Sequence, residues 1–120
     1  MVDMTPDEAA RARGWIADRR DLVASRLAGV EARLASVRAA RGDWIDEEHD
    51  PEGFALTFEW QQAEGSRVEY LRELVELDAA SARVAAGTFG VCTVCGGPIP
   101  DAQLELRPAR TTCVAHHKAG

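Results

Sequence analysis

Residues 87–100 read GTFGVCTVCGGPIP, and this stretch decides how the chain is organised. It holds a CxxC pair, Cys92 and Cys95, followed at once by two glycines and then by two prolines. Glycines permit the tight backbone that a metal-binding turn needs, and prolines stiffen the exit from it. A CxxH pair, Cys113 and His116, follows after 17 intervening residues. This spacing suits two ligand turns that face one tetrahedral metal ion.

We predict one structural zinc ion bound by Cys92, Cys95, Cys113 and His116. Zinc accepts this mixed set of thiolate and imidazole ligands, and four protein ligands leave no open position for a catalytic water. His117 is the alternative fourth ligand, but His116 keeps the two-residue spacing. A redox CxxC would need alternating strands and helices around it, and a catalytic zinc would use only three of these ligands.

A first long helix is predicted over residues 5–40. Thr5 can cap its start, Pro6 suits the first helical position, and Glu8 completes a capping box with Thr5. Beyond this start, mostly apolar residues recur at alternating steps of four and three, which places them in one narrow seam. The seam positions are Ile16, Arg20, Val23, Leu27, Val30, Leu34 and Val37.

A second long helix is predicted from Asp50 to Gly87. Asp50 serves as its cap, Pro51 lies in its first turn, and Gly87 tolerates the left-handed conformation that ends a helix. The same alternation of four and three recurs, and Val68, Leu71 and Val75 are expected to widen the stripe. The seam positions are Leu56, Trp60, Ala63, Arg67, Tyr70, Leu74, Leu77, Ser81 and Val84.

Two helices of this kind predict a mainly α fold. Each would be about 50 Å long, and a short connecting loop would make them antiparallel. We therefore expect a long two-helix coiled-coil hairpin over residues 1–87 and a small zinc-ribbon-like module over residues 88–120. The alternative is a compact helical bundle formed by dimerisation. Because a two-helix seam is a thin core, we expect a monomer or a weak dimer.

The loop between the helices, within residues 41–53, forms an acidic tip. Within it, residues 43–52 hold six carboxylates and no lysine or arginine: Asp43, Asp46, Glu47, Glu48, Asp50 and Glu52. Taken alone, such a loop is usually a solvated turn in which Asp50 serves only as a helix cap. Trp44 and Ile45 complicate that interpretation, because large apolar residues at the end of a hairpin either close its seam or are held out for a partner.

Composition and charge exclude several classes of function. The N-terminus has no basic region followed by an apolar stretch, and no run of 18 uncharged apolar residues occurs, so we expect a cytoplasmic protein without a signal peptide or membrane span. The net charge of −6 argues against a general binder of nucleic acids or anionic membranes, which needs a basic surface. A protein partner is favoured. Three clustered cysteines fit metal binding better than a disulfide framework.

With these residues in view, the chain resembles the DksA/TraR family of bacterial transcription regulators. The resemblance rests on residues 87–100, followed by Leu104, Pro108 and the ligand turn at Cys113. It implies that the hairpin enters the secondary channel of RNA polymerase, where Asp46, Glu48 and Asp50 at the tip would act near the catalytic magnesium. It also implies a regulator that is not an enzyme and does not bind specific DNA sequences. Whether a nucleotide alarmone acts with the protein stays open.

Three departures from the family limit what is carried over. A histidine at position 116 stands where the family usually has a fourth cysteine. The family's tip motif, two aspartates three apart followed by alanine, has no clean match here. Four residues follow His116, so we expect the C-terminal helix of larger members to be missing. Two other functions remain open: a polymerase accessory factor that promotes transcript cleavage, and a zinc-stapled interaction module with another partner.

Overall fold

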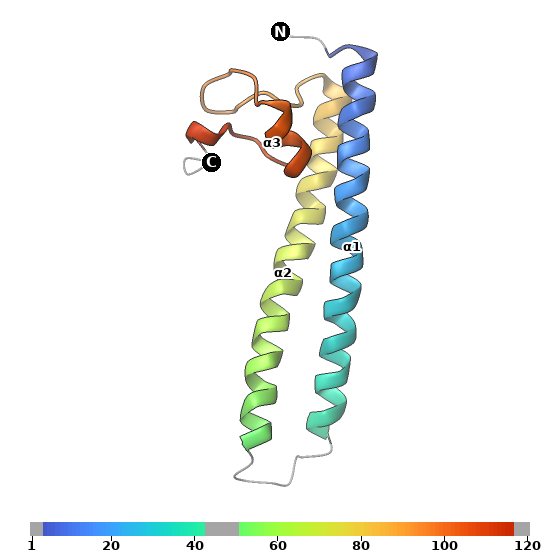
Figure 1. Ribbon diagram of the computed structural model, residues 1–120, viewed down its shortest axis with the longest axis vertical. Coiled ribbons are helices and arrows are strands. Elements are labelled where there is room, and N and C mark those ends of the chain that lie inside the picture. The colour runs from blue at the N-terminus through green and yellow to red at the C-terminus, as the bar shows by residue number, and fades with distance from the viewer. Residues whose placement is uncertain (1–3, 43–50, 117–120) are drawn as a thin grey trace. The chain divides into compact units, whose positions relative to one another are not determined.

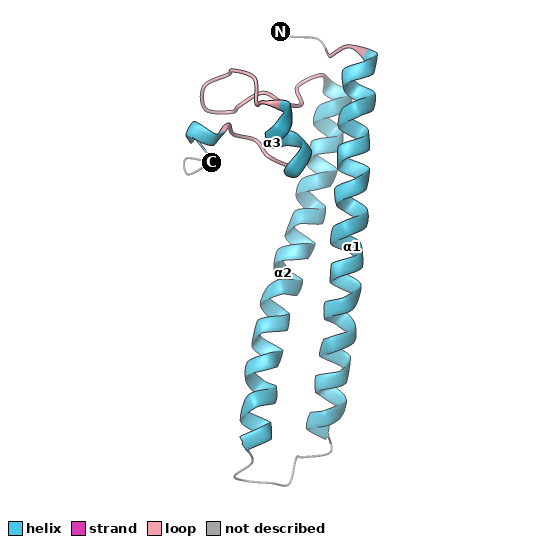
Figure 2. Ribbon diagram, viewed as in Figure 1, coloured by secondary structure: helices cyan, strands magenta, loops and turns pink. Residues whose placement is uncertain are grey.

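The computed structural model describes residues 4–42 and 51–116. Its elements in chain order are helix α1 (Pro6–Gly42), helix α2 (Pro51–Ala86), helix α3 (Asp101–Leu106) and a short 3-10 helix η1 (Val114–His116). Helices and loops account for all of the described chain in Figure 2, apart from one isolated antiparallel bridge between Val91 and Pro98. The mainly α fold, with two long helices that form a hairpin, is therefore confirmed.

The two long helices begin and end where local sequence chemistry favours it. At the start of α1, the Glu8 amide donates a hydrogen bond of 3.1 Å to Thr5 Oγ1, as an N-terminal cap requires. At the end of α2, Gly87 has φ 78°, and its amide donates to the Val84 carbonyl while the Thr88 amide donates to the Arg83 carbonyl. This pair of hydrogen bonds is a Schellman motif, which needs a left-handed residue at the position of Gly87.

The chain divides into two compact units, which are described separately. Unit 1 comprises Met1–Leu22 and Glu73–Gly120. In it, the start of α1 runs antiparallel to the end of α2, and α3 with its flanking loops packs on the same core (Figure 1). Its core side chains are Ala12, Ile16, Leu77, Ala80, Val84, Phe89, Cys92, Ile99 and Leu104. One hydrophobic core therefore joins the long helices to the cysteine-containing loop.

Unit 2 comprises Val23–Arg72 and is built from the remaining parts of α1 and α2. Val23, Leu27, Leu34 and Val37 of α1 are buried, as is Ala63 of α2. Across the pair, Arg33 Nε lies 3.7 Å from a carboxylate oxygen of Glu59, and the Arg38 guanidinium lies 5.4 Å from the centre of the Trp60 ring. The narrow apolar seam predicted for α1 is thus confirmed.

The predicted seam of α2 needs two corrections. Ser81 is exposed and Ala80 is buried in its place, so the packed face turns by one residue there. Val68, Leu71 and Val75 do not widen the packed stripe, because they are 43%, 40% and 68% exposed, respectively. A helix that meets one neighbour can bury only a narrow face, and these residues lie beside that face.

Neither long helix is apolar enough over any 18-residue window to cross a bilayer, within the ranges that the structure describes. The predicted acidic tip, including Asp46, Glu48 and Asp50, lies outside the described residues.

Candidate metal centre

The first two cysteines lie in a tight loop that its own backbone closes. The Cys92 amide donates a 2.8 Å hydrogen bond to the Gly97 carbonyl, and the Gly96 amide donates a 2.9 Å bond back to the Cys92 carbonyl. Gly96 has φ 72°, a left-handed conformation that residues with a Cβ adopt only at a cost. The sequence Cys-Gly-Gly thus lets the chain reverse directly after Cys95.

A second set of hydrogen bonds brings the Cys113 segment to this loop. The Thr93 amide donates a 2.9 Å hydrogen bond to the Thr111 carbonyl, which links the two cysteine-containing segments across the sequence. Pro108 is fully buried, and Arg83 of α2 donates a 3.4 Å hydrogen bond to the Ala109 carbonyl. Burial lowers the pKa of Arg83 from its usual value. These contacts fix the path of the chain that leads to Cys113.

As a result, the thiols of Cys92, Cys95 and Cys113 converge. Their sulfur atoms all lie within 4.8 Å of one another. Two thiolates on one tetrahedral zinc, each at about 2.3 Å, are separated by about 3.8 Å, so the three sulfurs are close to the arrangement that zinc needs. Cys92 is buried, Cys113 is half-buried and Cys95 is exposed.

The electrostatics around these thiols also suit a cation. Hydrogen bonds from the backbone amides of Cys95 and then Cys113 lower the pKa of Cys92 to about 6. Burial, followed by the effect of the neighbouring sulfurs, raises the pKa of Cys113. A thiolate at Cys92 is therefore favoured in the protein alone, whereas a negative charge on Cys113 needs a bound cation beside it.

The side chains of the remaining predicted site residues lie outside the part of the chain that the structure describes. His116 ends helix η1, but its side chain lies outside the described part of the structure, as does the whole of His117. Asp46, Glu48 and Asp50 lie in the undescribed tip. The fourth ligand and the tip acids therefore remain predictions.

Sequence patterns do not reveal the residues that support the ligand turns. Arg83 carried no signal, because its partner, the Ala109 carbonyl, is 26 residues away and is a backbone group. The hydrogen bond between Thr93 and Thr111 is also a backbone contact, which side-chain patterns do not reveal. Pro108 was noticed only as part of the family resemblance, although it is among the most deeply buried side chains.

Comparison with known proteins agrees with this geometry. Residues 87–115 match the prokaryotic dksA/traR C4-type zinc finger family. The fold matches the structure of transcription factor DksA2 from Pseudomonas aeruginosa with a TM-score of 0.73 and 21% sequence identity. The match covers 97% of this chain and 84% of that chain. No curated protein sequence matches this chain significantly.

The matched family segment contains all three converging cysteines and ends one residue before His116. A zinc-finger segment with three thiols around one point identifies the cofactor as a structural zinc ion. The shared fold extends the likeness from this segment to the long helices. Residues 87–115 of this chain therefore match the zinc finger of the DksA/TraR family, and this segment is carried on a helical hairpin fold similar to that of DksA2.

Proposed function

We propose that this protein is a cytoplasmic bacterial transcription regulator that binds RNA polymerase through the secondary channel and is not itself an enzyme. The observation that carries the proposal is the family's zinc-finger segment on a fold that matches DksA2 over 97% of the chain. The acidic composition supports a protein partner, because a net charge of −6 opposes binding to nucleic acid or anionic lipid.

The helix pair suits a probe that must enter a narrow channel. In unit 1, Arg19 binds the Glu73 carboxylate through two nitrogen atoms. In unit 2, Arg33 and Glu59 form a weaker cross-helix pair above the buried seam. Paired charges and interlocked apolar side chains resist bending and sliding of the two helices. Either unit therefore keeps its two helices in a fixed register.

We further propose that the zinc ion is bound by Cys92, Cys95, Cys113 and His116. The convergence of the three thiols supports the first three ligands. His116 is favoured over His117 because it preserves the two-residue spacing of a ligand turn. With four protein ligands the ion has no open position, so its part is to hold the two cysteine-containing segments together and not to activate water.

The acidic tip is proposed to act by charge. Asp46, Glu48 and Asp50 at the end of the hairpin would approach the catalytic magnesium of the polymerase and change the electrostatic potential around it. This effect needs short distances and a low local dielectric, both of which a narrow protein channel supplies. Initiation is therefore the step that we expect to respond.

Binding to RNA polymerase is the test of this function. The zinc-loaded chain should co-purify with bacterial RNA polymerase, and a factor known to occupy the secondary channel should displace it. A chain whose residues 43–50 are replaced by a glycine–serine loop should still bind but should not alter initiation. Absence of binding by the zinc-loaded chain would contradict the proposal and favour an interaction module with another partner. Cleavage of transcripts in stalled complexes would identify an accessory cleavage factor instead.

A further inference from the structure

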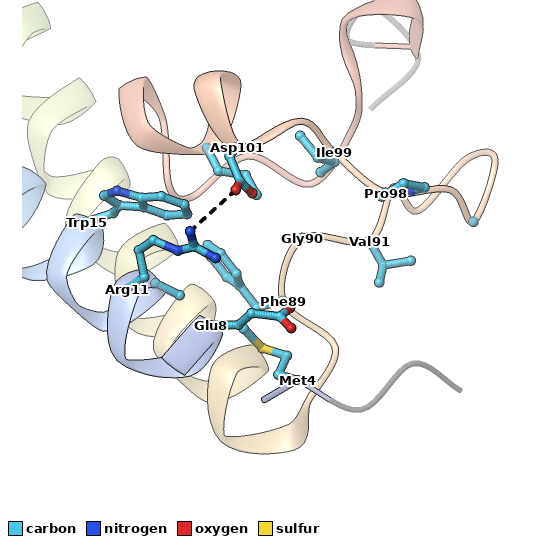
Figure 3. Close-up of a pocket in the computed structure, with 13 residues that line it drawn as sticks. Met4, Glu8, Arg11, Trp15, Phe89, Gly90, Val91, Pro98, Ile99 and Asp101 are labelled. Carbon is cyan, nitrogen blue, oxygen red and sulfur yellow. Dashed lines mark ion pairs between the residues drawn. The ribbon is translucent and has the colours of Figure 1, made fainter. Parts of the chain in front are cut away.

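A cavity of about 330 Å³ lies within unit 1, beside the metal centre (Figure 3). The first turns of α1 form one wall, and the segment from Phe89 to Leu104 forms the other. Its apolar lining comprises Met4, Ala12, Trp15, Phe89, Ile99 and Leu104. Ala12, Phe89, Ile99 and Leu104 belong to the buried core, so the cavity has a packed apolar floor.

The rim of this cavity is charged. Glu8 and Arg11 from α1 and Asp101 from the start of α3 all line it. Figure 3 shows Arg11 reaching from α1 toward Asp101, with one nitrogen 3.9 Å from a carboxylate oxygen. The two side chains are 55% and 67% exposed, so this ion pair contributes little and can exchange partners.

The balance of charge on the rim decides what the cavity can accept. The lining holds two carboxylates and one guanidinium, and the guanidinium already lies 5.8 Å from the centre of the Trp15 ring, where the π-face attracts a cation. An anionic ligand would meet the Glu8 and Asp101 carboxylates as well as Arg11. A ligand with positive charges beside an apolar group would instead gain from both carboxylates.

We propose that this cavity binds a basic segment of a partner protein, with one large apolar side chain inserted and lysine or arginine on either side of it. The volume lies at the small end of the range for ligand pockets, about 300–1,000 Å³, and thus suits one side chain better than a large cofactor. The aromatic rings of Trp15 and Phe89 in the lining favour an aromatic or branched apolar group. This inference does not depend on the proposed action of the tip on polymerase.

The floor of the cavity is held in place before any ligand binds. Gly90 has φ 81°, and a Cβ atom there would lie 3.3 Å from Leu104 Cδ1, so the loop backbone is packed directly against α3. The Ile99 amide donates a 2.8 Å hydrogen bond to the Gly90 carbonyl, which fixes the loop on its other side. A preformed site loses less conformational entropy on binding than a site that must order.

The test uses the full zinc-loaded chain and three short peptides with blocked ends. The probe is Lys-Phe-Lys, and its two controls are Glu-Phe-Glu, which reverses the charge, and Lys-Gly-Lys, which removes the ring. Amide chemical shifts measured by NMR should move saturably for Trp15, Gly90 and Val91 with the probe. Both controls should bind at least about fivefold more weakly, and added salt should weaken the probe because its charges lie at an exposed rim.

Variants of the rim separate this site from general attraction to an acidic protein. Glu8→Gln combined with Asp101→Asn should weaken probe binding at least about threefold, since it removes both rim carboxylates. Glutamine at position 8 can still complete a capping box, so the start of α1 is preserved. Glu76→Gln combined with Glu105→Gln is the matched control: both positions are exposed and outside the cavity lining, and the same number of charges is removed, so probe binding should not change. Val91→Trp adds a large group at the lining and should reduce binding independently of charge.

Three results would overturn the proposal. The first is the absence of saturable shifts with the probe in a correctly folded, zinc-loaded sample. The second is equal or tighter binding of Glu-Phe-Glu, which would make the cavity a site for organic anions. The third is a set of shifts at the same residues that depends on protein concentration without any peptide, which would show that a second copy of the chain occupies the cavity. None of these measurements uses polymerase, so their outcome is separate from that of the proposed function.

Discussion

Arg19 of α1 and Glu73 of α2 form a two-point ion pair, in which Nε and Nη2 lie 2.5 and 2.9 Å from the two carboxylate oxygens. Both side chains are only 19% exposed. They are 54 positions apart in the sequence, so the pair fixes which turn of α1 faces which turn of α2. A planar guanidinium that binds a carboxylate in this way adds directional specificity to the apolar seam.

Removing the charge at this pair should destabilise the hairpin. We expect Glu73→Gln to lower the free energy of unfolding by about 1–3 kcal/mol, because the half-buried Arg19 keeps its charge but loses its anionic partner, and an NH2 donor replaces one of the two acceptor oxygens. Urea denaturation followed by circular dichroism measures this change. As a control, Asp78→Asn breaks the more exposed pair with Arg20 and should cost only about 0–1 kcal/mol. Equal effects of the two variants would contradict a special role for Arg19 and Glu73.

Two glycines should respond to alanine in opposite directions. Gly90→Ala would force a Cβ onto a residue at φ 81° and place it 3.3 Å from Leu104 Cδ1, so we expect a loss of about 1–3 kcal/mol. Gly65 lies inside α2 with nothing within 4 Å of an added Cβ. Gly65→Ala should therefore stabilise the protein by about 0.5–1 kcal/mol through higher helix propensity. Thermal unfolding of both variants, each with zinc bound, checks the prediction.

Much of the fold could be predicted because its signals are local. The cap at Thr5 and the left-handed end at Gly87 depend on chemistry within a few residues. The seam of α1 was also readable, since a regular helix converts spacing directly into a face. The seam predicted for α2 is wrong at Ser81, because strict alternation of four and three cannot show where the neighbouring helix shifts the packed face by one residue.

The metal centre could be predicted in part, whereas its surroundings could not. The spacing of Cys92, Cys95 and Cys113 predicts that they bind one metal ion, and the structure brings their sulfur atoms together. The cavity beside them unites Trp15 with Phe89, and contacts between residues so far apart in the sequence leave no periodic signal. Periodicity is also insufficient at Val68, Leu71 and Val75, because these apolar side chains follow the predicted stripe and yet remain 40–68% exposed.

Protein purified with reduced cysteines should contain about one zinc ion per chain, as measured by mass spectrometry of the metal. Cys95→Ser should lose the metal and the dispersed NMR signals of residues 88–116, because the two cysteine-containing segments are no longer tied together. Most of the helical signal in circular dichroism should remain, since α1 and α2 keep their seam.

The fourth ligand is tested by His116→Ala, which should weaken zinc binding, while His117→Ala should not. The reverse order would exchange their roles.

Zinc affinity should rise with pH across the neutral range. The pKa of Cys92 is lowered to about 6, so this residue is already mostly thiolate at pH 7. The pKa of Cys113 is raised by burial and the neighbouring sulfurs, so this residue is protonated there and must release its proton to bind zinc. Affinity should therefore increase about tenfold or more per pH unit above about pH 6, and fall more steeply below it as Cys92 also protonates. Competition with a chromophoric chelator measures this, and a constant affinity would contradict the role of Cys113.

The last prediction separates binding to polymerase from the effect on transcription. If the tip acts by charge, replacing Asp46 and Asp50 by asparagine should abolish the effect on initiation and leave affinity for polymerase within about threefold. Asparagine caps a helix nearly as well as aspartate, so Asp50→Asn removes charge without weakening the start of α2, whereas Asp50→Ala would change both. In vitro transcription from several promoters, beside a competition binding assay, gives the two readouts.

The control for this experiment must carry the same change in net charge at another place. Asp18→Asn combined with Asp21→Asn meets that need, because both residues are exposed on α1 in unit 1. This variant should bind polymerase and alter initiation as the unmodified chain does, since the field of two exposed charges is screened within about 8 Å in physiological salt. Equal loss of activity in both variants would point to net charge as the cause. Full activity in the tip variant would leave steric occlusion of the channel as the mechanism, because the hairpin would then act by its volume alone.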